Sequence, residues 1–168
     1  MQFASNSGPY GIQPASMQTR CVNKSGTTLK VGDVVVTSFL HTSVVTDPSQ
    51  SNDPAYVFNT VRLADGDEAN NHGYLGVVTR LQAEGGGPDK VVNVQFGGIA
   101  NAFVTIVSGG TVPAGTPLVP TDSGGKFTNS GNDSSASMIG AVLLEEATSA
   151  TTAARVFIPL QYWMAVTI

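Results

Sequence analysis

Short apolar runs rich in β-branched residues recur along the chain, and they constrain the fold more than any other feature. Clusters of Gly, Pro, Asn and Asp separate these runs at strand-like spacing, and no window keeps the 3.6-residue period of an amphipathic helix. The sequence therefore predicts an all-β protein. The expected strands are residues 19–23, 34–40, 57–63, 76–82, 91–96, 102–107, 118–120, 138–144, 155–160 and 162–168.

The segments between these runs are predicted to be loops. Residues 144–154 are rich in Ala, but their Thr and Ser content favours a loop or short turn over a helix. Residues 46–56 and 121–137 are polar and punctuated by Pro or Gly, which indicates long loops.

Parts of the second half of the chain resemble parts of the first. The matches are residues 29–36 with 112–119, 75–78 with 139–142, and 92–94 with 156–158. We expect two similar three-strand halves that close one small β-barrel, β-tulip-like fold or sandwich, because each half alone would leave an apolar face bare. The alternative is chance recurrence of glycine turns before Val-rich strands. The first copy is longer around residues 42–60, which we interpret as an insertion.

Four glycines of this repeat have structural interpretations. Gly32 and Gly115 precede apolar strands, where a turn needs a positive φ or leaves no room for a side chain. Gly76 and Gly140 lie inside predicted strands, where glycine indicates a close backbone approach or a sharp bend.

The first 20 residues lack the pattern of the rest. They contain Gly-Pro and Gln-Pro pairs and the isolated apolar residues Phe3, Tyr10 and Ile12. We expect residues 1–20 to form an extended N-terminal arm and residues 21–168 to form the barrel-like body; a disordered tail is the alternative.

Charge and composition exclude several classes of protein. The net charge is −4, and the eight Lys and Arg residues are scattered, so nucleic-acid binding is not expected. No apolar run approaches the roughly 20 residues that cross a bilayer, and no signal peptide is recognisable, so we expect synthesis in a cytoplasm. Charged residues make up only 12% of the chain, about half the usual share of roughly 25%, which suits a protein docked on other protein.

A search for catalytic or cofactor sites gives no candidate, and we expect neither enzyme activity nor a cofactor. His41 and His72 are the only histidine bases, and no Gly-x-Ser-x-Gly motif is present. Residues 124–128 resemble a phosphate loop superficially, but Pro120 and Phe127 break the motif, and a β-hairpin loop is predicted instead. Cys21 is the single cysteine, and we interpret it as a small buried hydrophobe.

Two acidic clusters receive structural interpretations. Residues 65–73 form the densest group of oxygen ligands, which we expect to be a solvated loop, with a structural cation at Asp65 or Asp67 as the alternative. Glu145 and Glu146 would point to opposite faces of a strand, so we expect solvent-facing charge rather than general acid–base chemistry.

Aromatic and large apolar residues outside the repeat are our candidates for contacts with other subunits. Tyr162 and Trp163 follow the last repeat strand, and the alternative is that they fill the protein's own core. The full set of candidates is Phe3, Tyr10, Ile12, Tyr56, Phe58, Tyr162 and Trp163.

Three segments of the second half follow one another as a glycine turn and two apolar strands: Ala114-Gly115-Thr116-Pro117-Leu118-Val119, Ile139-Gly140-Ala141-Val142-Leu143-Leu144 and Arg155-Val156-Phe157-Ile158-Pro159-Leu160. This series resembles small tailed-phage capsid decoration or cement proteins. The resemblance covers residues 29–160, more closely in the second half. It implies a β-barrel or β-tulip fold on the outer capsid surface of the virion, the major capsid protein as partner, a homotrimer, and no catalytic residues to carry over. The N-terminal arm and the 42–60 insertion depart from the family pattern.

We therefore expect a structural virion protein that bridges neighbouring capsid subunits and stabilises the shell. The alternatives are a tail or fibre component, a small β-barrel hydrolase and a carbohydrate-binding module. A hydrolase would need a clustered histidine, acid and nucleophile. A carbohydrate-binding module would need several exposed aromatic residues on one sheet face, and aromatic residues make up only 7% of this chain.

Overall fold

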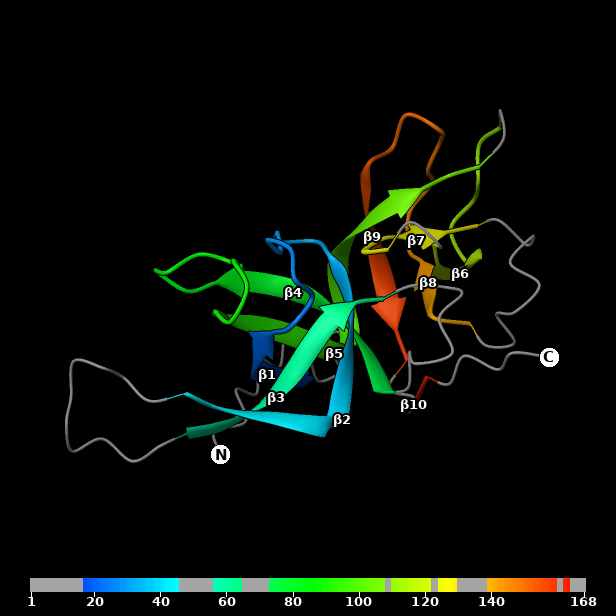
Figure 1. The fold of residues 1–168 in the computed structure, drawn as a ribbon. Coiled ribbons are helices and arrows are strands. Elements are labelled where there is room, and N and C mark those ends of the chain that lie inside the picture. The colour runs from blue at the N-terminus through cyan, green and yellow to red at the C-terminus, as the bar shows by residue number, and fades with distance from the viewer. Residues whose placement is uncertain are drawn as a thin grey trace, which may run out of the picture.

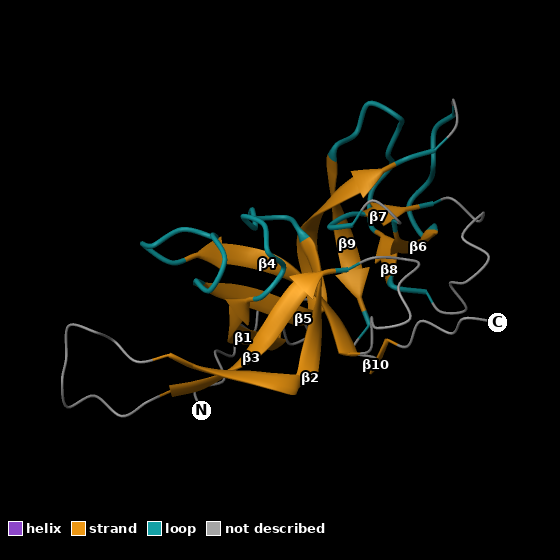
Figure 2. Cartoon of the chain, in the orientation of Figure 1, coloured by secondary structure: helices purple, strands orange, loops and turns teal. Residues whose placement is uncertain are grey.

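The computed structural model describes residues 17–45, 56–64, 73–107, 110–121, 124–129, 139–159 and 162–163, with side chains described outside 38–45, 56–59, 73 and 162–163. Every regular element in these residues is a strand, as Figure 2 shows, so the all-β prediction is confirmed. The strands are β1 (Met17–Asn23), β2 (Val34–Val45), β3 (Tyr56–Leu63), β4 (Gly73–Leu81), β5 (Val91–Thr105), β6 (Pro117–Pro120), β7 (Phe127–Thr128), β8 (Ala141–Leu143), β9 (Ala153–Ile158) and β10 (Tyr162–Trp163).

Several strand bounds differ from the prediction, and β2, for example, continues to Val45 instead of ending at residue 40. The two strands expected at 91–96 and 102–107 form one continuous 15-residue strand, β5. The short strand β7 lies inside the stretch predicted to be a long loop, where Phe127 is fully buried. Strand β1 begins at Met17, so the last four residues assigned to the N-terminal arm belong to the sheet.

The first five strands close into a barrel. Strand β1 pairs in parallel with β3 and antiparallel with β5. Strand β2 pairs with both β3 and β4, and β4 pairs with β5, all antiparallel. The ring β1–β3–β2–β4–β5 therefore returns to its starting strand and leaves no open edge in its paired region.

A second ring of five strands follows on the same β5. The C-terminal part of β5 pairs in parallel with β7 and antiparallel with β9. Strand β6 pairs with β7 and β8, and β8 pairs with β9, again antiparallel. Figure 1 shows β1–β4 in blue to green on one side and β6–β9 in yellow to orange on the other, with β5 running through both groups.

The two rings have the same topology and the same register. Three cross-strand residue pairs of the first ring have counterparts in the second. Cys21–Val92 corresponds to Ala102–Ala154, Val35–Gly76 corresponds to Leu118–Ala141, and Val78–Val94 corresponds to Leu143–Val156. The glycine turns also match, since the Gly32 N–H donates to the Val78 carbonyl over 2.9 Å and the Gly115 N–H donates to the Leu143 carbonyl over 2.7 Å. The chain is therefore a tandem repeat of one barrel, and each unit has five strands rather than the expected three.

Part of the sequence alignment between the two halves is shifted in the structure. Residues 29–36 do correspond to 112–119, but Gly76 corresponds to Ala141 rather than to Gly140. Val156 corresponds to Val94 rather than to Val92. The sequence comparison matches identical Gly and Val residues, whereas in the structure the equivalent positions of the two barrels are those whose side chains face inward.

The two strand glycines therefore have different packing roles. Gly76 lies against the first barrel's interior, where an added Cβ would stand 2.6 Å from Val94 Cγ1. An added Cβ at Gly140 would stand 3.1 Å from Leu75 Cδ1 and from Phe127 Cε1. The nearest atoms at both positions belong to side chains, so the crowding comes from side chains and not from the close backbone approach that the sequence predicts.

The two turn glycines share one backbone conformation. Gly32 has φ of 102° and Gly115 has φ of 90°, in the left-handed region that favours glycine. At Gly32 an added Cβ would also stand 3.3 Å from the ring of Phe103 on β5, so this turn is packed against the shared strand.

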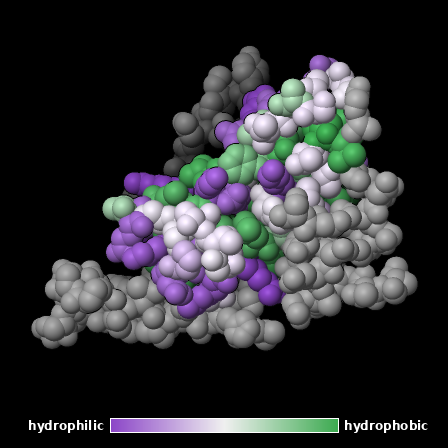
Figure 3. All heavy atoms as spheres, turned by 45° about the horizontal axis from the view of Figure 1, so that its top comes forward, coloured by the Kyte–Doolittle hydropathy of each residue, from purple (hydrophilic) through white to green (hydrophobic). Residues whose placement is uncertain are grey.

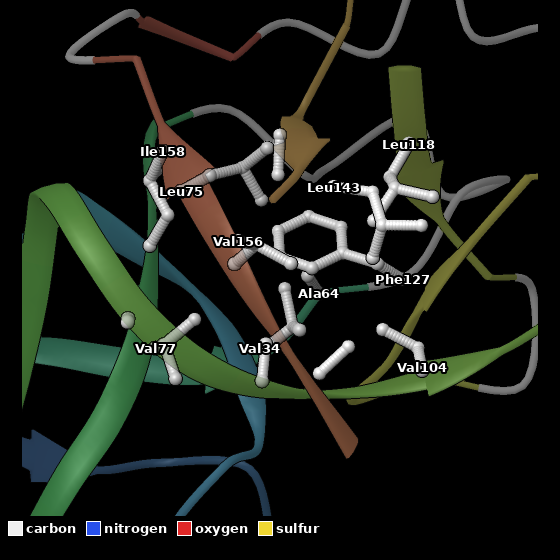
Figure 4. Close-up of a cluster of buried hydrophobic side chains, with 14 of the residues drawn as sticks. Val34, Ala64, Leu75, Val77, Val104, Leu118, Phe127, Leu143, Val156 and Ile158 are labelled. Carbon is white, nitrogen blue, oxygen red and sulfur yellow. The ribbon is translucent and has the colours of Figure 1, made fainter. Parts of the chain in front are cut away.

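Two apolar clusters fill the barrels, and one of them joins the two. The first barrel's interior contains Cys21, Leu29, Val35, Val61, Val78, Val92, Val94 and Phe96. The larger cluster combines the second barrel's interior with side chains from the outer face of β2 and β4, including Val34, Val36, Leu75 and Val77. Figure 4 shows the Phe127 ring in this cluster, with Leu118, Leu143 and Val156 around it. Strands β2 and β4 are therefore buried on both faces.

Strand β5 changes barrels near Gly97 and Gly98. The even-numbered residues of β5 from Val92 to Val104 are all buried. At the change of barrel, Gly98 has a positive φ of 84°, and the register of the β1–β5 pairing shifts opposite Gly97. The buried Gln95 side chain donates from Nε2 to the Gly97 carbonyl over 2.9 Å and to the Ile99 carbonyl over 2.7 Å. These bonds satisfy carbonyl groups at the point where the strand leaves the first barrel.

The substitution Gly76→Ala is expected to lower the free energy of unfolding by about 1–3 kcal/mol, because the new methyl group overpacks the first barrel against Val94. Chemical denaturation followed by circular dichroism measures this change. Gly87→Ala is the matched control, since its added Cβ would meet only Lys90 Cγ at 3.9 Å. Equal stability of Gly76→Ala and Gly87→Ala would show that this contact does not limit the packing.

Candidate functional site

An open cleft of about 470 Å³ lies where the two barrels meet, which is within the size range of ligand sites. The first barrel contributes the turn before β2 and the end of β3, and the second contributes the β6–β7 turn and the loop before β9. Strand β5 supplies the floor. The lining residues are Thr28, Lys30, Asp33, Leu63, Phe103, Val104, Thr105, Lys126, Ser149, Thr151 and Thr152.

Backbone hydrogen bonds tie the cleft walls to its floor. The Phe103 N–H donates to the Gly32 carbonyl over 2.8 Å, and the Val104 N–H donates to the Thr152 carbonyl over 3.1 Å. The wall loop is itself closed by a turn in which the Thr148 N–H donates to Thr151 Oγ1 over 3.0 Å. The cleft shape is thus set by the frame of the two barrels.

Two lysines from different barrels reach the cleft. Lys30 and Lys126 are exposed, and neither forms an ion pair within the described part of the chain. Three other basic side chains do form surface ion pairs among the same residues: Lys24 with Asp89, Lys90 with Glu84, and Arg155 with Glu145. The cleft therefore presents two ammonium groups that no described carboxylate reaches at ion-pair distance, although the charges of both act on Asp33.

Among the described residues that line the cleft, Asp33 is the single carboxylate. Its Oδ2 accepts a hydrogen bond from the Lys30 backbone N–H over 2.6 Å, so it fixes the turn. Partial burial raises the pKa of Asp33, against the opposing effects of that hydrogen bond and of the Lys30 and Lys126 charges. The second barrel has Thr116 at the equivalent turn position, so this carboxylate belongs to one copy of the repeat only.

The floor and rim have different chemistry. Leu63, Phe103 and Val104 are apolar, and the Phe103 ring is covered on one side by the Gly32 turn. The rim carries five hydroxyl groups, from Thr28, Thr105, Ser149, Thr151 and Thr152. Hydroxyl groups both donate and accept hydrogen bonds, so the rim can pair with either type of polar group on a ligand.

The predicted contact residues lie away from this cleft. Phe3, Tyr10 and Ile12 lie outside the described residues. In β10, Tyr162 pairs with Tyr74 and Trp163 pairs with Gly73, so this strand continues the sheet beside β4.

The predicted insertion at 42–60 includes a hairpin. Past a register shift between Ser38 and Thr42, strands β2 and β3 pair with each other through Ser43–Phe58 and Val45–Tyr56. Tyr56 and Phe58 therefore lie on this hairpin, which projects from the first barrel in Figure 1. Residues 46–55 lie outside the described residues.

The remaining candidates for chemistry fall largely outside the described side chains. His41 is in β2 with its side chain undescribed, and His72, Asp65 and Asp67 lie outside the described residues. No group of three His, Cys, Asp or Glu side chains that could hold a metal occurs in the part of the chain that was searched.

The paired acids at the end of β8 have a structural partner. Glu145 accepts hydrogen bonds from the Arg155 backbone N–H over 2.8 Å and from Arg155 Nε over 3.0 Å, and these bonds lower the pKa of Glu145. Glu146 is exposed. Glu145 thus holds the start of β9, and only Glu146 is plainly solvent-facing as expected.

The Gly124–Gly125 turn joins β6 to β7, so the predicted β-hairpin loop is confirmed. In the sequence, its neighbour Lys126 belongs to an interrupted phosphate motif, and Lys30 belongs to the repeat. No short-range sequence signal brings these two lysines together, because their approach depends on how the barrels pack.

The described surface is mixed in polarity. On the face drawn in Figure 3, green apolar side chains are interrupted by purple hydrophilic ones. The exposed large apolar residues among those described are Met17, Val31, Ile99, Val107, Ile139 and Leu144.

Two comparisons with known protein sequences give no match. No protein-family model matches the chain, and no curated protein sequence matches it. Among the described residues, no helix has the length and apolar character needed to span a bilayer.

Cys21 behaves as the small apolar residue that the sequence predicts. Its side chain is fully buried in the first barrel, and this burial raises the pKa of the thiol to about 12. The thiolate is the reactive species, so the native protein holds very little of it near neutral pH.

We expect the native protein to react with Ellman's reagent at pH 8 far more slowly than a free thiol does. In 8 M urea the same sample should release one equivalent of chromophore at the rate of an exposed cysteine. Reaction of the native protein at that unfolded rate would show that Cys21 is accessible and not part of the core.

Proposed function

We propose that the protein is a structural virion component that binds the outer surface of a phage capsid and stabilises the shell by bridging neighbouring capsid subunits. The observation that carries this proposal is the pair of equivalent barrels on one shared strand. The motif resemblance to capsid decoration proteins, found most clearly in the second half, supports it.

A bridging protein needs two attachment regions that are held at a fixed spacing. When both regions engage together, the second contact forms at a high effective concentration, and the total affinity exceeds that of either region. The two barrels provide two such regions, and strand β5 together with the shared apolar cluster joins them. Such a rigid connection loses little freedom on docking, which favours tight binding.

The projecting β2–β3 hairpin is the attachment element that we propose on the first barrel. Residues 43–45 and 56–58 pair with each other beyond the ring, and no other strand of the described residues pairs with them, so we propose that their outer backbone groups pair with another chain. Tyr56 and Phe58 lie on this hairpin and are of the residue type that dominates the energy of protein interfaces. In this proposal the N-terminal arm with Phe3, Tyr10 and Ile12 makes a second contact.

The proposed partner is the major capsid protein, and the proposed assembly on the shell is a homotrimer. Three chains with two barrels each would place six equivalent units around one axis. Tyr162 and Trp163 of β10 are proposed to contact the neighbouring copy, since they extend the sheet beyond β4.

Mixing the purified protein with expanded shells that lack it, followed by electron cryomicroscopy, tests the proposal. We expect density on the outer shell surface that spans the junction between capsid subunits. Density on the tail alone would indicate a tail or fibre component instead, and absence of binding would contradict the proposal.

Shortening the hairpin tests its proposed role. Thr42 and Asn59 are cross-strand partners, so residues 43–58 can be replaced by an Asn-Gly turn without loss of the ring pairing. We expect this variant to keep its unfolding midpoint within a few degrees but to lose most of its shell occupancy. A variant with residues 1–16 deleted, which leaves β1 intact, measures the contribution of the arm separately. Full occupancy by both variants would rule out both attachment elements.

A further inference from the structure

We propose that the cleft between the barrels binds an extended acidic peptide segment. The identity of that segment as part of the capsid protein rests on the proposed function, whereas the binding chemistry rests on the cleft itself. Its geometry comes from both barrels, since the turn that carries Lys30, the β6–β7 turn that carries Lys126 and the loop at 149–152 meet around strand β5.

The charge of the cleft selects an anionic ligand. Among the described lining residues there are two ammonium groups and one carboxylate, Asp33, which already accepts a hydrogen bond from the Lys30 backbone N–H. Because Lys30 and Lys126 form no ion pair within the described residues, a ligand carboxylate can approach them without displacing any ion-pair partner among those residues. Among the other basic side chains of the described residues, Lys24, Lys90 and Arg155 are paired with neighbouring acids. Arg20, Arg62 and Arg80 form no ion pair within those residues, but none of them lines the cleft.

The floor of the cleft selects a peptide rather than a simple anion. The cleft lining holds the apolar side chains of Leu63, Phe103 and Val104 together with the two lysines. In an extended peptide, alternate side chains point to opposite sides, so acidic residues can meet the lysines while apolar residues meet the floor. The rim hydroxyls, such as those of Thr28 and Ser149, can pair with the peptide backbone.

Other ligand classes fit less well. A polysaccharide is commonly held on an open aromatic face, and one side of the Phe103 ring is occupied by the Gly32 turn. A nucleic acid needs a larger set of clustered basic residues than two lysines. An extended acidic peptide uses the lysines, the hydroxyls and the apolar floor together.

Fluorescence anisotropy with a labelled (Glu-Leu)₃ peptide and the full-length protein tests the proposal. We expect saturable binding that weakens with added salt, and little binding of the matched (Gln-Leu)₃ peptide. The double variant Lys30→Ala/Lys126→Ala should weaken binding by about tenfold, as expected for the loss of two partly exposed charge contacts.

The control variant is Lys24→Ala/Lys90→Ala, which removes the same charge from two lysines outside the cleft. It should bind the (Glu-Leu)₃ peptide like the unmodified protein. Equal weakening by both double variants, or equal binding of the glutamine peptide, would overturn the proposal. Displacement of the peptide by millimolar sulfate, or tighter binding of dextran sulfate, would also overturn it in favour of a general anion site or a polysaccharide site.

The cleft and the bridging function can fail separately. If the unmodified protein binds the peptide but does not decorate shells, the bridging function fails and the cleft proposal stands. The opposite outcome has two parts: neither the unmodified protein nor the Lys30→Ala/Lys126→Ala variant binds the peptide, and the two proteins decorate shells equally densely. In that case the cleft proposal fails and the bridging function stands.

Discussion

One strand, β5, belongs to two closed barrels, and the rest of the structure depends on this sharing. Its first part completes the ring of β1–β4, and its second part completes the ring of β6–β9. Its buried residues from Val92 to Phe96 pack in the first barrel, and those from Ala100 to Val104 pack in the second. Neither ring can close without it.

The sharing extends from backbone pairing to the apolar core. Val34, Val36, Leu75 and Val77 leave the first barrel on its outer face and pack with the second barrel's interior. Loss of the second barrel would therefore expose the double-sided strands β2 and β4 to water, at a cost of roughly 25 cal/mol per Å² of apolar surface. The large, joined core accounts for how short strands such as β7 and β8 can be stable parts of a barrel.

The sequence predicted the class of fold and most strands because β-branched runs and glycine turns are local signals. It also revealed the repeat at the Gly32 and Gly115 turns, where both copies need the same left-handed backbone. It misplaced the correspondence at Gly76 and Gly140, because pairing register is set by inward-facing side chains and not by matching letters. The union of two predicted strands into β5 was missed because Gly97 and Gly98 are typical of a strand end.

The candidate site could not be predicted for a related reason. Lys30 and Lys126 lie far apart in the sequence, and only the packing of one barrel against the other places both at the cleft. The aromatic residues singled out as contacts lie on the hairpin, on β10 or outside the described residues. The proposed attachment surfaces and the proposed peptide cleft are therefore separate parts of one rigid double barrel.

Native-state hydrogen exchange along β5 tests most directly whether the two barrels form one unit. The shared strand and core predict that amides in residues 92–96 and 100–104 exchange through the same global unfolding, with equal free energies and equal denaturant dependence. The contradicting result is a free energy of exchange for residues 100–104 that lies several kcal/mol below that of residues 92–96 and depends less on denaturant. Such a result would show that the second barrel opens while the first stays folded.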